Sequence, residues 1–302
     1  LNEFEDVLNS LLHIRNADVY VTGSNSKFLS SDVITQFRGR GDEIHVYPLS
    51  FSEYVPAYQG SVDEAWDDYL IYGGMPLILT MAEPEDKAAY LNSLFQKVYI
   101  SDIVERHDVR NKVELDELVD ILASAIGSYT KLVRTFKSVK GKTISDKTIK
   151  NYIDYLIDSF LISKAVRYDI KGKKYIGSPS KYYFEDVGLR NARLGFRQVE
   201  QTHLMENIIY NELRIRGYHV DVGVVEYYGV NGEGKRGKKQ LEVDFVATKG
   251  SEKHYIQSAF TLPTADKVDQ EQRSLLHIPD SFRKIVVVGD NIKVRRDENG
   301  II

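Results

Sequence analysis

The chain has 302 residues, 42% of them hydrophobic and 28% charged, which is the composition of a globular protein and a length that suits two or three domains. It contains no cysteine, which excludes disulfides, thiolate metal sites and a cysteine nucleophile and is typical of a reducing cytoplasm. No run of 18 apolar residues and no N-terminal signal pattern occurs, so we expect a cytoplasmic protein without a membrane partner.

The charge is unevenly distributed along the chain. The formal net charge is −4, which by itself argues against a nucleic-acid-binding protein. Residues 131–181, however, carry thirteen lysines or arginines against four aspartates or glutamates, a local charge of +9 that leaves −13 for the remainder. Charge segregated in this way predicts one basic module within an acidic protein.

Residues 1–60 alternate between helical and strand patterns. A helix begins at the first residue, apolar strands are expected at 17–23 and 43–50, and a helix lies between them. Such alternation favours a parallel α/β sheet, but two strands are too few to bury both of its faces. We therefore expect the end of a larger α/β domain whose start lies upstream. A mostly helical part follows over 61–112, interrupted by YGGMP at 72–76.

Residues 113–195 indicate helices followed by a basic hairpin, which is the order of a winged helix. The clearest helix lies in TISDKTIKNYIDYLIDSFLI, where Ser145 can cap the first turn and apolar residues recur at helical spacing. Residues 196–302 indicate a small α/β domain with a Gly-rich, mobile loop at 229–240. Its expected elements are a helix at 202–216 and strands at 219–228, 241–248, 253–260 and 283–290.

The chain contains one GKT triplet, at Gly141–Thr143. A phosphate loop needs a glycine five residues earlier and a strand before it. Phe136 stands at that position and the preceding pattern is helical, so the triplet does not predict a nucleotide site.

Motifs spread over the whole chain resemble a family of prokaryotic AAA+ ATPases. They are, in order, VYVTGSNSKFLS, FRGR, YPLSFSEY, YGGMP, KYYFEDVGLRNA, MENIIYNEL and LEVDFV. Members of that family join a nucleotide-binding domain to a winged helix and to a C-terminal domain with a restriction-endonuclease-like fold. The resemblance implies an α/β, multidomain protein. Its parts would be the end of the parallel-sheet AAA+ domain (1–60), a helical lid (61–112), a winged helix (113–195) and the nuclease-like domain (196–302).

The resemblance also implies nucleotide-site residues. Asn25 would be the first sensor, which orients the water that attacks the γ-phosphate, and Arg38 and Arg40 stand where an arginine finger is expected. Gly73, Gly74 and Pro76 resemble the lid motif beside the nucleotide. The alternative is a loop asparagine, two solvated arginines and a helix-ending turn. ATP and Mg²⁺ would bind the intact protein through a phosphate loop upstream of Leu1, and we expect this chain alone to bind neither tightly.

The basic module is a candidate for contact with duplex DNA. Phosphate contacts need only a high density of cations, without base readout. The alternative is a lid or a protein-docking surface with solvated lysines. The candidate residues are Lys131, Arg134, Lys137, Arg167, Lys171, Lys173 and Lys174.

In the last domain, Glu206 and Asp244 have the order of a metal-dependent nuclease core. By resemblance, a Glu-x-Lys would follow on the next strand, but Gln257 and Ala259 stand there. We therefore expect a degenerate site, in which Glu206 and Asp244 could also be plain structural charges. Strand alternation places Glu242 on the face of Asp244, where it could replace the lost acid.

These observations lead to one functional hypothesis and two rivals. The hypothesis is an ATP-driven switch that couples nucleotide state to a DNA or protein partner, in a protein that can self-associate and whose nuclease-like domain is inactive. The rivals are a non-catalytic interaction module, of a toxin–antitoxin or defence type, and an active metal-dependent nuclease.

Overall fold

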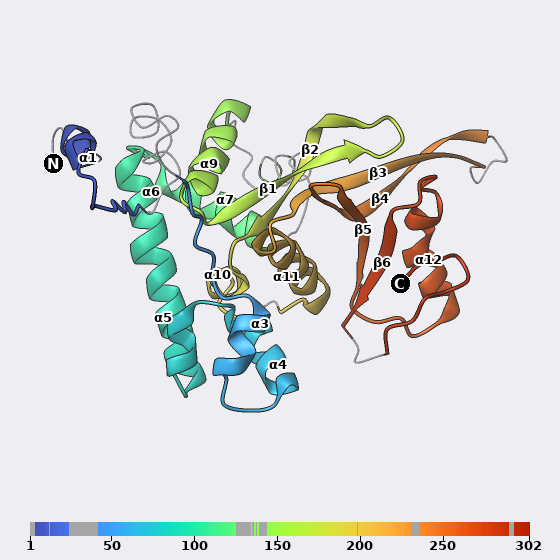
Figure 1. Ribbon diagram of the computed structural model, residues 1–302, viewed down its shortest axis with the longest axis horizontal. Helices are drawn as coiled ribbons and strands as arrows, with labels where there is room; N and C mark the ends of the chain where they lie inside the picture. Colours follow the sequence, from blue (N-terminus) through green and yellow to red (C-terminus); the bar gives the residue numbers. More distant parts are fainter. Residues whose placement is uncertain are drawn as a thin grey trace.

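The computed structural model joins a helical part to a mixed β-sheet (Figure 1). It describes residues 4–11, 13–23, 42–124, 134, 136, 138, 144–197, 199–230, 236–289 and 293–302. None of the helices in these ranges is long and apolar enough to cross a membrane.

The helical part precedes most of the sheet. Its helices are α1 (Phe4–Leu11), α3 (Phe51–Tyr54), α4 (Val62–Tyr72), α5 (Pro84–Ser93), α6 (Ser101–Arg106), α7 (Lys112–Ser124), α9 (Asp146–Asp158) and α10 (Val187–Arg193). Short 3-10 segments occupy Val55–Ala57 and Pro76–Thr80, and a π-helical segment occupies Leu94–Ile100. The apolar faces of α5, α6, α7, α9 and α10 share one core. The helix predicted around Ser145 is confirmed, because the Ser145 side chain accepts a hydrogen bond from the backbone N–H of Thr148 and begins α9.

The sheet has the order β2-β1-β3-β4-β5-β6. Its strands are β1 (Ile162–Asp169), β2 (Lys174–Phe184), β3 (His219–Val230), β4 (Arg236–Lys249), β5 (Glu252–Ala259) and β6 (Arg283–Val288). Neighbouring strands are antiparallel except for the pairs β1/β3 and β5/β6, which are parallel. Helix α11 (Gln201–Ile215) packs on one face and α12 (Ala265–Leu276) on the other, each over its own apolar cluster (Figure 1).

The basic hairpin β1–β2 belongs to this sheet. Strand β1 pairs with β3 through Arg167–Asp169 and Val222–Val224. One sheet therefore spans the boundary expected at 195/196, and α10 and α11 connect its two portions. The winged-helix assignment remains a prediction; the structure shows the order of α9 followed by a hairpin that is built into a larger sheet.

Two sequence expectations need correction. The expected loop at 229–240 is shorter, because Val230 pairs with Arg236 and both strands continue toward the hairpin tip. The strands expected at 17–23 and 43–50 are not formed: their described residues lie in neither helix nor strand. A strand needs a neighbour for its backbone N–H and C=O groups, and no described strand lies beside these segments. The helix expected between them lies outside the described residues.

Candidate functional site

A β-bulge in β4 places Asp244 and Phe245 on the same face of the sheet, toward α11. Asp221 pairs with Val246 but Gly223 pairs with Val243, so β4 has one residue more than β3 between these pairs. Bulges re-aim side chains and are frequent next to functional sites. Two consecutive residues turn to the same face as a result: Phe245 packs beneath α11, and Asp244 joins a polar cluster at the edge of that helix.

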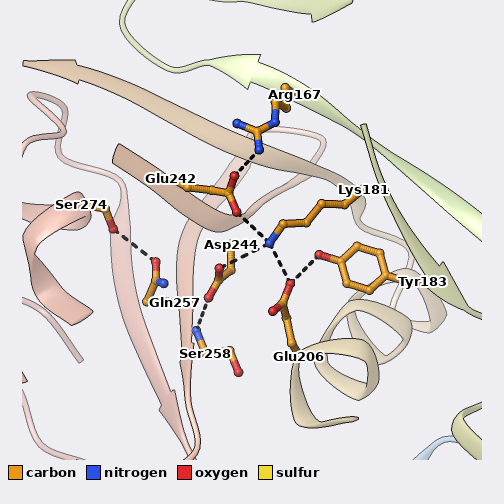
Figure 2. Close-up of polar contacts among 9 residues, drawn as sticks. All are labelled: Arg167, Lys181, Tyr183, Glu206, Glu242, Asp244, Gln257, Ser258 and Ser274. Carbon is orange, nitrogen blue, oxygen red and sulfur yellow. Dashed lines mark hydrogen bonds and ion pairs between the residues drawn. The ribbon is translucent and has the colours of Figure 1, made fainter. Parts of the chain in front are cut away.

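Lys181 lies at the centre of this cluster (Figure 2). Its Nζ lies 2.9 Å from Oε1 of Glu206, 2.8 Å from Oε1 of Glu242 and 3.9 Å from Oδ1 of Asp244. The lysine comes from β2, Glu206 from α11 and the other two acids from β4, so three elements meet at one ammonium group. We call these four residues the lysine–carboxylate cluster. The Lys181 side chain is only 10% exposed.

Neighbouring groups fix the orientation of each carboxylate. The hydroxyl of Tyr183 donates to Oε1 of Glu206 at 2.8 Å, and the backbone N–H of Ser258 donates to Oδ2 of Asp244 at 2.9 Å. The guanidinium of Arg167 pairs with Glu242. With all of these groups ionised, the three carboxylates face two cations, so the cluster together with Arg167 carries one negative charge.

The cluster shifts the pKa values of its members. Burial, followed by the charge of the Glu206 carboxylate, raises the pKa of Asp244 to about 7, although the charge of Lys181 opposes the rise. Burial alone would lower the pKa of Lys181, but the carboxylates of Glu206, Glu242 and Asp244 together raise it above its ordinary value. Burial, followed by the charge of Glu206, raises the pKa of Tyr183. The lysine is therefore a permanent cation, and Asp244 is the acid that can take up a proton near neutral pH.

The expected metal residues Glu206 and Asp244 come together, and so does Glu242. Oxygen donors of this kind suit Mg²⁺. However, the ammonium of Lys181 stands between the three side chains, and within the described part of the chain no group of three or more His, Asp or Glu side chains is arranged to hold a metal ion.

The prediction that Gln257 occupies the third acidic position of the metal site is wrong. Gln257 turns away from Asp244, and its Oε1 accepts a hydrogen bond from the Ser274 hydroxyl of α12 (Figure 2). On β5 it is Ser258 that lies beside Asp244. Gln257 and Ala259 are therefore not the equivalents of a lost Glu-x-Lys at this cluster. The lysine of the cluster is Lys181, which the sequence reasoning missed.

Gly73 and Gly74, expected beside a nucleotide, lie in a tightly packed junction. Gly74 donates its N–H to Oδ2 of Asp186 at 2.7 Å, and its carbonyl accepts from the backbone N–H of Leu49 at 2.8 Å. A Cβ at Gly74 would lie 2.2 Å from the Leu49 carbonyl oxygen. Gly73 has φ +72° and ends α4, and Pro76 begins the next 3-10 segment. Close approach of the Leu49 backbone explains Gly74, whereas the positive φ and the nearby Asp186 carboxylate explain Gly73.

Asp186 is the acid of this junction. It caps α10 by accepting from the N–H of Leu189 at 3.0 Å, and burial raises its pKa to about 6 although the N–H groups of Gly74, Leu189 and Gly188 lower it. A Cβ at Gly188 would lie 2.0 Å from the Tyr72 carbonyl oxygen. The segments YGGMP (72–76) and FEDVG (184–188) therefore pack closely against each other.

Polar residues on α11 bind the other side of the junction. Asn207 exchanges two hydrogen bonds with the backbone of Phe184, at 3.0 and 2.7 Å. Asn211 donates to the carbonyls of Phe184 and Glu185, each at 3.0 Å, and Glu212 accepts from the N–H of Phe51 at 2.7 Å. The sequence reasoning did not single out these residues. The available signal was two asparagines four residues apart on an otherwise apolar helix face.

The expected DNA contacts have different surroundings. Arg167 is ion-paired with Glu242, and Lys171 donates to the carbonyl of Glu226 at 2.7 Å. Lys173 and Lys174 are exposed at the hairpin tip, and Arg134 is exposed on a helix. The remaining expected residues, Asn25, Arg38, Arg40, Lys131 and Lys137, lie outside the described residues.

The fold and these contacts define a mixed α/β protein with a helical part and a six-stranded sheet, in which Leu49 and Phe51 are hydrogen-bonded to Gly74 and to Glu212 of α11. Residues 1–55 match a family described as "AAA domain", and residues 63–200 match a family described as "Domain of unknown function". The first match relates the chain to AAA-type ATPases. No solved structure gives a significant match.

Two prokaryotic relatives match nearly the whole chain. A protein of Haemophilus influenzae, described as uncharacterised, is 34% identical over 294 residues, which are 95% of this chain and 69% of the relative. An uncharacterised protein of Methanocaldococcus jannaschii is 29% identical over 292 residues, 92% of this chain and 62% of the relative. The chain belongs to the family of the Haemophilus influenzae protein. It spans about two thirds of the length of these two relatives.

Proposed function

We propose that the chain is the C-terminal portion of an AAA-type ATPase, which passes the nucleotide state of its ATPase domain to the mixed sheet. The observation that carries this proposal is the junction around Gly74. The AAA-matching segment ends at residue 55, and its residues Leu49 and Phe51 are hydrogen-bonded to Gly74 and to Glu212 of α11.

Each bond of the junction involves a different part of the chain. Leu49 contacts the end of α4 through Gly74, and Gly74 contacts the start of α10 through Asp186. Asp186 follows directly on β2, which carries Lys181. A displacement of residues 47–51 would therefore be felt by α10, by α11 and by the sheet. Short, buried polar contacts favour two discrete arrangements over gradual deformation.

The nucleotide chemistry is proposed by family resemblance. Asn25 would orient the attacking water, and Arg38 or Arg40 would act on the nucleotide of a neighbouring subunit, so the active protein would be a homo-oligomer that binds ATP and Mg²⁺. In the full-length protein, Arg38→Ala or Arg40→Ala should lower ATP turnover by about 10³-fold while nucleotide binding is kept. Unchanged turnover in both variants would remove this assignment.

The partner would be DNA or protein. The exposed Lys173 and Lys174 at the hairpin tip favour a phosphate-bearing partner. Arg167 and Lys171 are engaged within the protein and contribute less to such a surface.

Hydrogen–deuterium exchange on the full-length protein tests the switch. ATP in place of ADP should change exchange in residues 185–215, beyond the AAA-matching segment. In Glu212→Ala, which removes the acceptor of the Phe51 N–H, the change in α11 should be lost while ATP turnover remains. If nucleotide alters exchange only within residues 1–55 of the wild type, the rival proposal of an interaction module with a structural nucleotide is correct.

A further inference from the structure

The lysine–carboxylate cluster resembles a cation-binding site in which a lysine side chain takes the place of the cation. Three carboxylates from two elements converge on one point, and the group at that point is the Lys181 ammonium (Figure 2). We propose that Lys181 is an internal substitute for a divalent metal ion, and that it keeps this acidic site closed to Mg²⁺ and Mn²⁺.

The ammonium is hydrogen-bonded to two of the three acids and lies near the third. A lysine ammonium has three N–H donors and no acceptor. The distances of 2.9 Å to Glu206 and 2.8 Å to Glu242 are those of charge-assisted hydrogen bonds, whereas Asp244, at 3.9 Å, is an ion-pair partner beyond hydrogen-bond distance. Both strong contacts use carboxylate oxygens that a metal ion would need.

The lysine is held in place by its strand. Lys181 pairs with Ala165 of β1, and Tyr183, two residues further along β2, is fully buried. The ring of Tyr183 stacks on Tyr210 with centroids 4.1 Å apart, while its hydroxyl binds the same Glu206 oxygen as the ammonium. With this anchoring and a side chain that is 10% exposed, Lys181 cannot move into solvent without opening the β2–α11 contact.

Electrostatics then oppose metal binding. A divalent ion beside the ammonium would meet a like charge in a poorly solvated site, where such repulsion is strong. Displacement of the ammonium would instead leave the lysine buried without its partners, which is strongly unfavourable. Without Lys181 the three carboxylates would carry three negative charges against Arg167 alone, and this arrangement suits a hard divalent cation.

Mn²⁺ binding to the full chain, followed by electron paramagnetic resonance, tests the proposal. Wild-type protein should show no site that depends on Asp244. Lys181→Met, which keeps an unbranched side chain one atom shorter and removes its charge, should gain one site at least 100-fold tighter than any wild-type binding. Lys181→Met/Asp244→Asn should lose that site again. Lys164→Met, an exposed lysine on the adjacent strand β1, is the matched control and should behave as wild type.

Folding of the variants is checked by circular dichroism and thermal unfolding. Mn²⁺ should raise the melting temperature of Lys181→Met and leave that of the wild type unchanged. If Lys181→Met does not fold, Lys181→Met/Glu242→Gln carries one negative charge fewer and should fold and bind Mn²⁺. The proposal is overturned if wild-type protein binds Mn²⁺ through Asp244, if a folded Lys181→Met binds none, or if neither lysine variant folds in Mn²⁺. Nicking of plasmid DNA by the wild type with Mn²⁺, abolished by Asp244→Asn, would instead indicate an active nuclease.

Discussion

Asp244 and Asp186 are both buried acids, but their surroundings differ. Asp244 lies beside Glu206, whose charge adds to the effect of burial, and its pKa rises to about 7. Asp186 has no carboxylate among the causes of its shift, and three backbone N–H groups hold its pKa to about 6. The first acid belongs to a charged cluster, and the second is a structural cap. Substitutions at the two positions should therefore affect different properties.

The raised pKa of Asp244 should make stability depend on pH. Its pKa is 3.8 in the unfolded chain and about 7 in the folded protein, so the folded state binds this proton more tightly. The stabilisation is complete below pH 3.8 and is lost as the pH rises to about 7. Asp244→Asn, which can still accept from the Ser258 N–H, should remove this loss.

The measurement is the free energy of unfolding in urea between pH 5 and pH 8. The wild type should lose more stability over this interval than Asp244→Asn does, whereas Asp67→Asn, at an exposed position of α4, should keep the wild-type slope. Equal slopes for the wild type and Asp244→Asn would contradict the shift at Asp244.

Gly74 should not tolerate a side chain. A Cβ would lie 2.2 Å from the Leu49 carbonyl oxygen, which is backbone and cannot rotate away. Gly74→Ala should therefore cost about 2 kcal/mol or more of unfolding free energy, the range of strained or overpacked positions. Gly177→Ala is the matched control, because a Cβ there meets nothing within 4 Å. Urea unfolding of both variants checks this, and equal stabilities would show that the junction can adjust.

The lysine–carboxylate cluster shows which of its residues a sequence pattern can predict. Alternation correctly predicted that Glu242 and Asp244 share a face, because the bulge begins only after Glu242. It could not locate the lysine. Lys181 lies 25 residues before Glu206, on the edge strand β2. Strands β1 and β3 lie between β2 and β4 in the sheet, so only the tertiary structure brings Lys181 to the acids of β4. The family motif predicts the lysine on β5, at the position of Ala259. The side chain of Gln257 on the same strand faces α12 instead.

At the scale of elements, patterns with a local partner were predicted well. Helix α9 has its capping residue Ser145 and its apolar residues in one short segment, and β3 and β4 pair with each other as a hairpin. The segments 17–23 and 43–50 have equally apolar patterns, but a parallel strand needs a neighbour that is distant in sequence. In the second segment Ile44 and Val46 are 79% and 86% exposed, while His45 packs against Tyr47 and Phe160. The pattern is strand-like, and among the described residues no strand pairs with it.

The β1–β2 hairpin should give any DNA binding its salt dependence. Each phosphate contact contributes about −0.9 to the slope of log K against log salt on duplex DNA. Lys173→Ala/Lys174→Ala should therefore flatten the slope by about 1.8 without changing sequence preference. Lys97→Ala, an exposed lysine in the helical part, should leave the slope unchanged. Fluorescence anisotropy with a short duplex measures this. If no duplex binds at low salt, the hairpin is a protein-docking surface.

The whole molecule is held together by contacts that cross its sequence divisions. Leu49 is hydrogen-bonded to Gly74 at the end of α4, Gly74 to Asp186 at the start of α10, and α11 covers the sheet while binding Phe51. Helix α11 therefore contacts Phe51 through Glu212 and also carries Glu206 of the lysine–carboxylate cluster.

The exposed apolar side chains of residues 17–23 and 43–50 should drive self-association of this chain. Tyr20, Ile44 and Val46 are 88%, 79% and 86% exposed, on two segments whose sequences have the alternation of buried strands. Burial of such a side chain stabilises an interface by about 1.5–3 kcal/mol. Ile44→Ser/Val46→Ser should therefore weaken self-association at least tenfold in sedimentation equilibrium. Val294→Ser removes a side chain that is 87% exposed elsewhere and should have no effect. A wild-type chain that stays monomeric at every concentration, or a double variant that associates as strongly as the wild type, would show that these side chains do not mediate contact between copies.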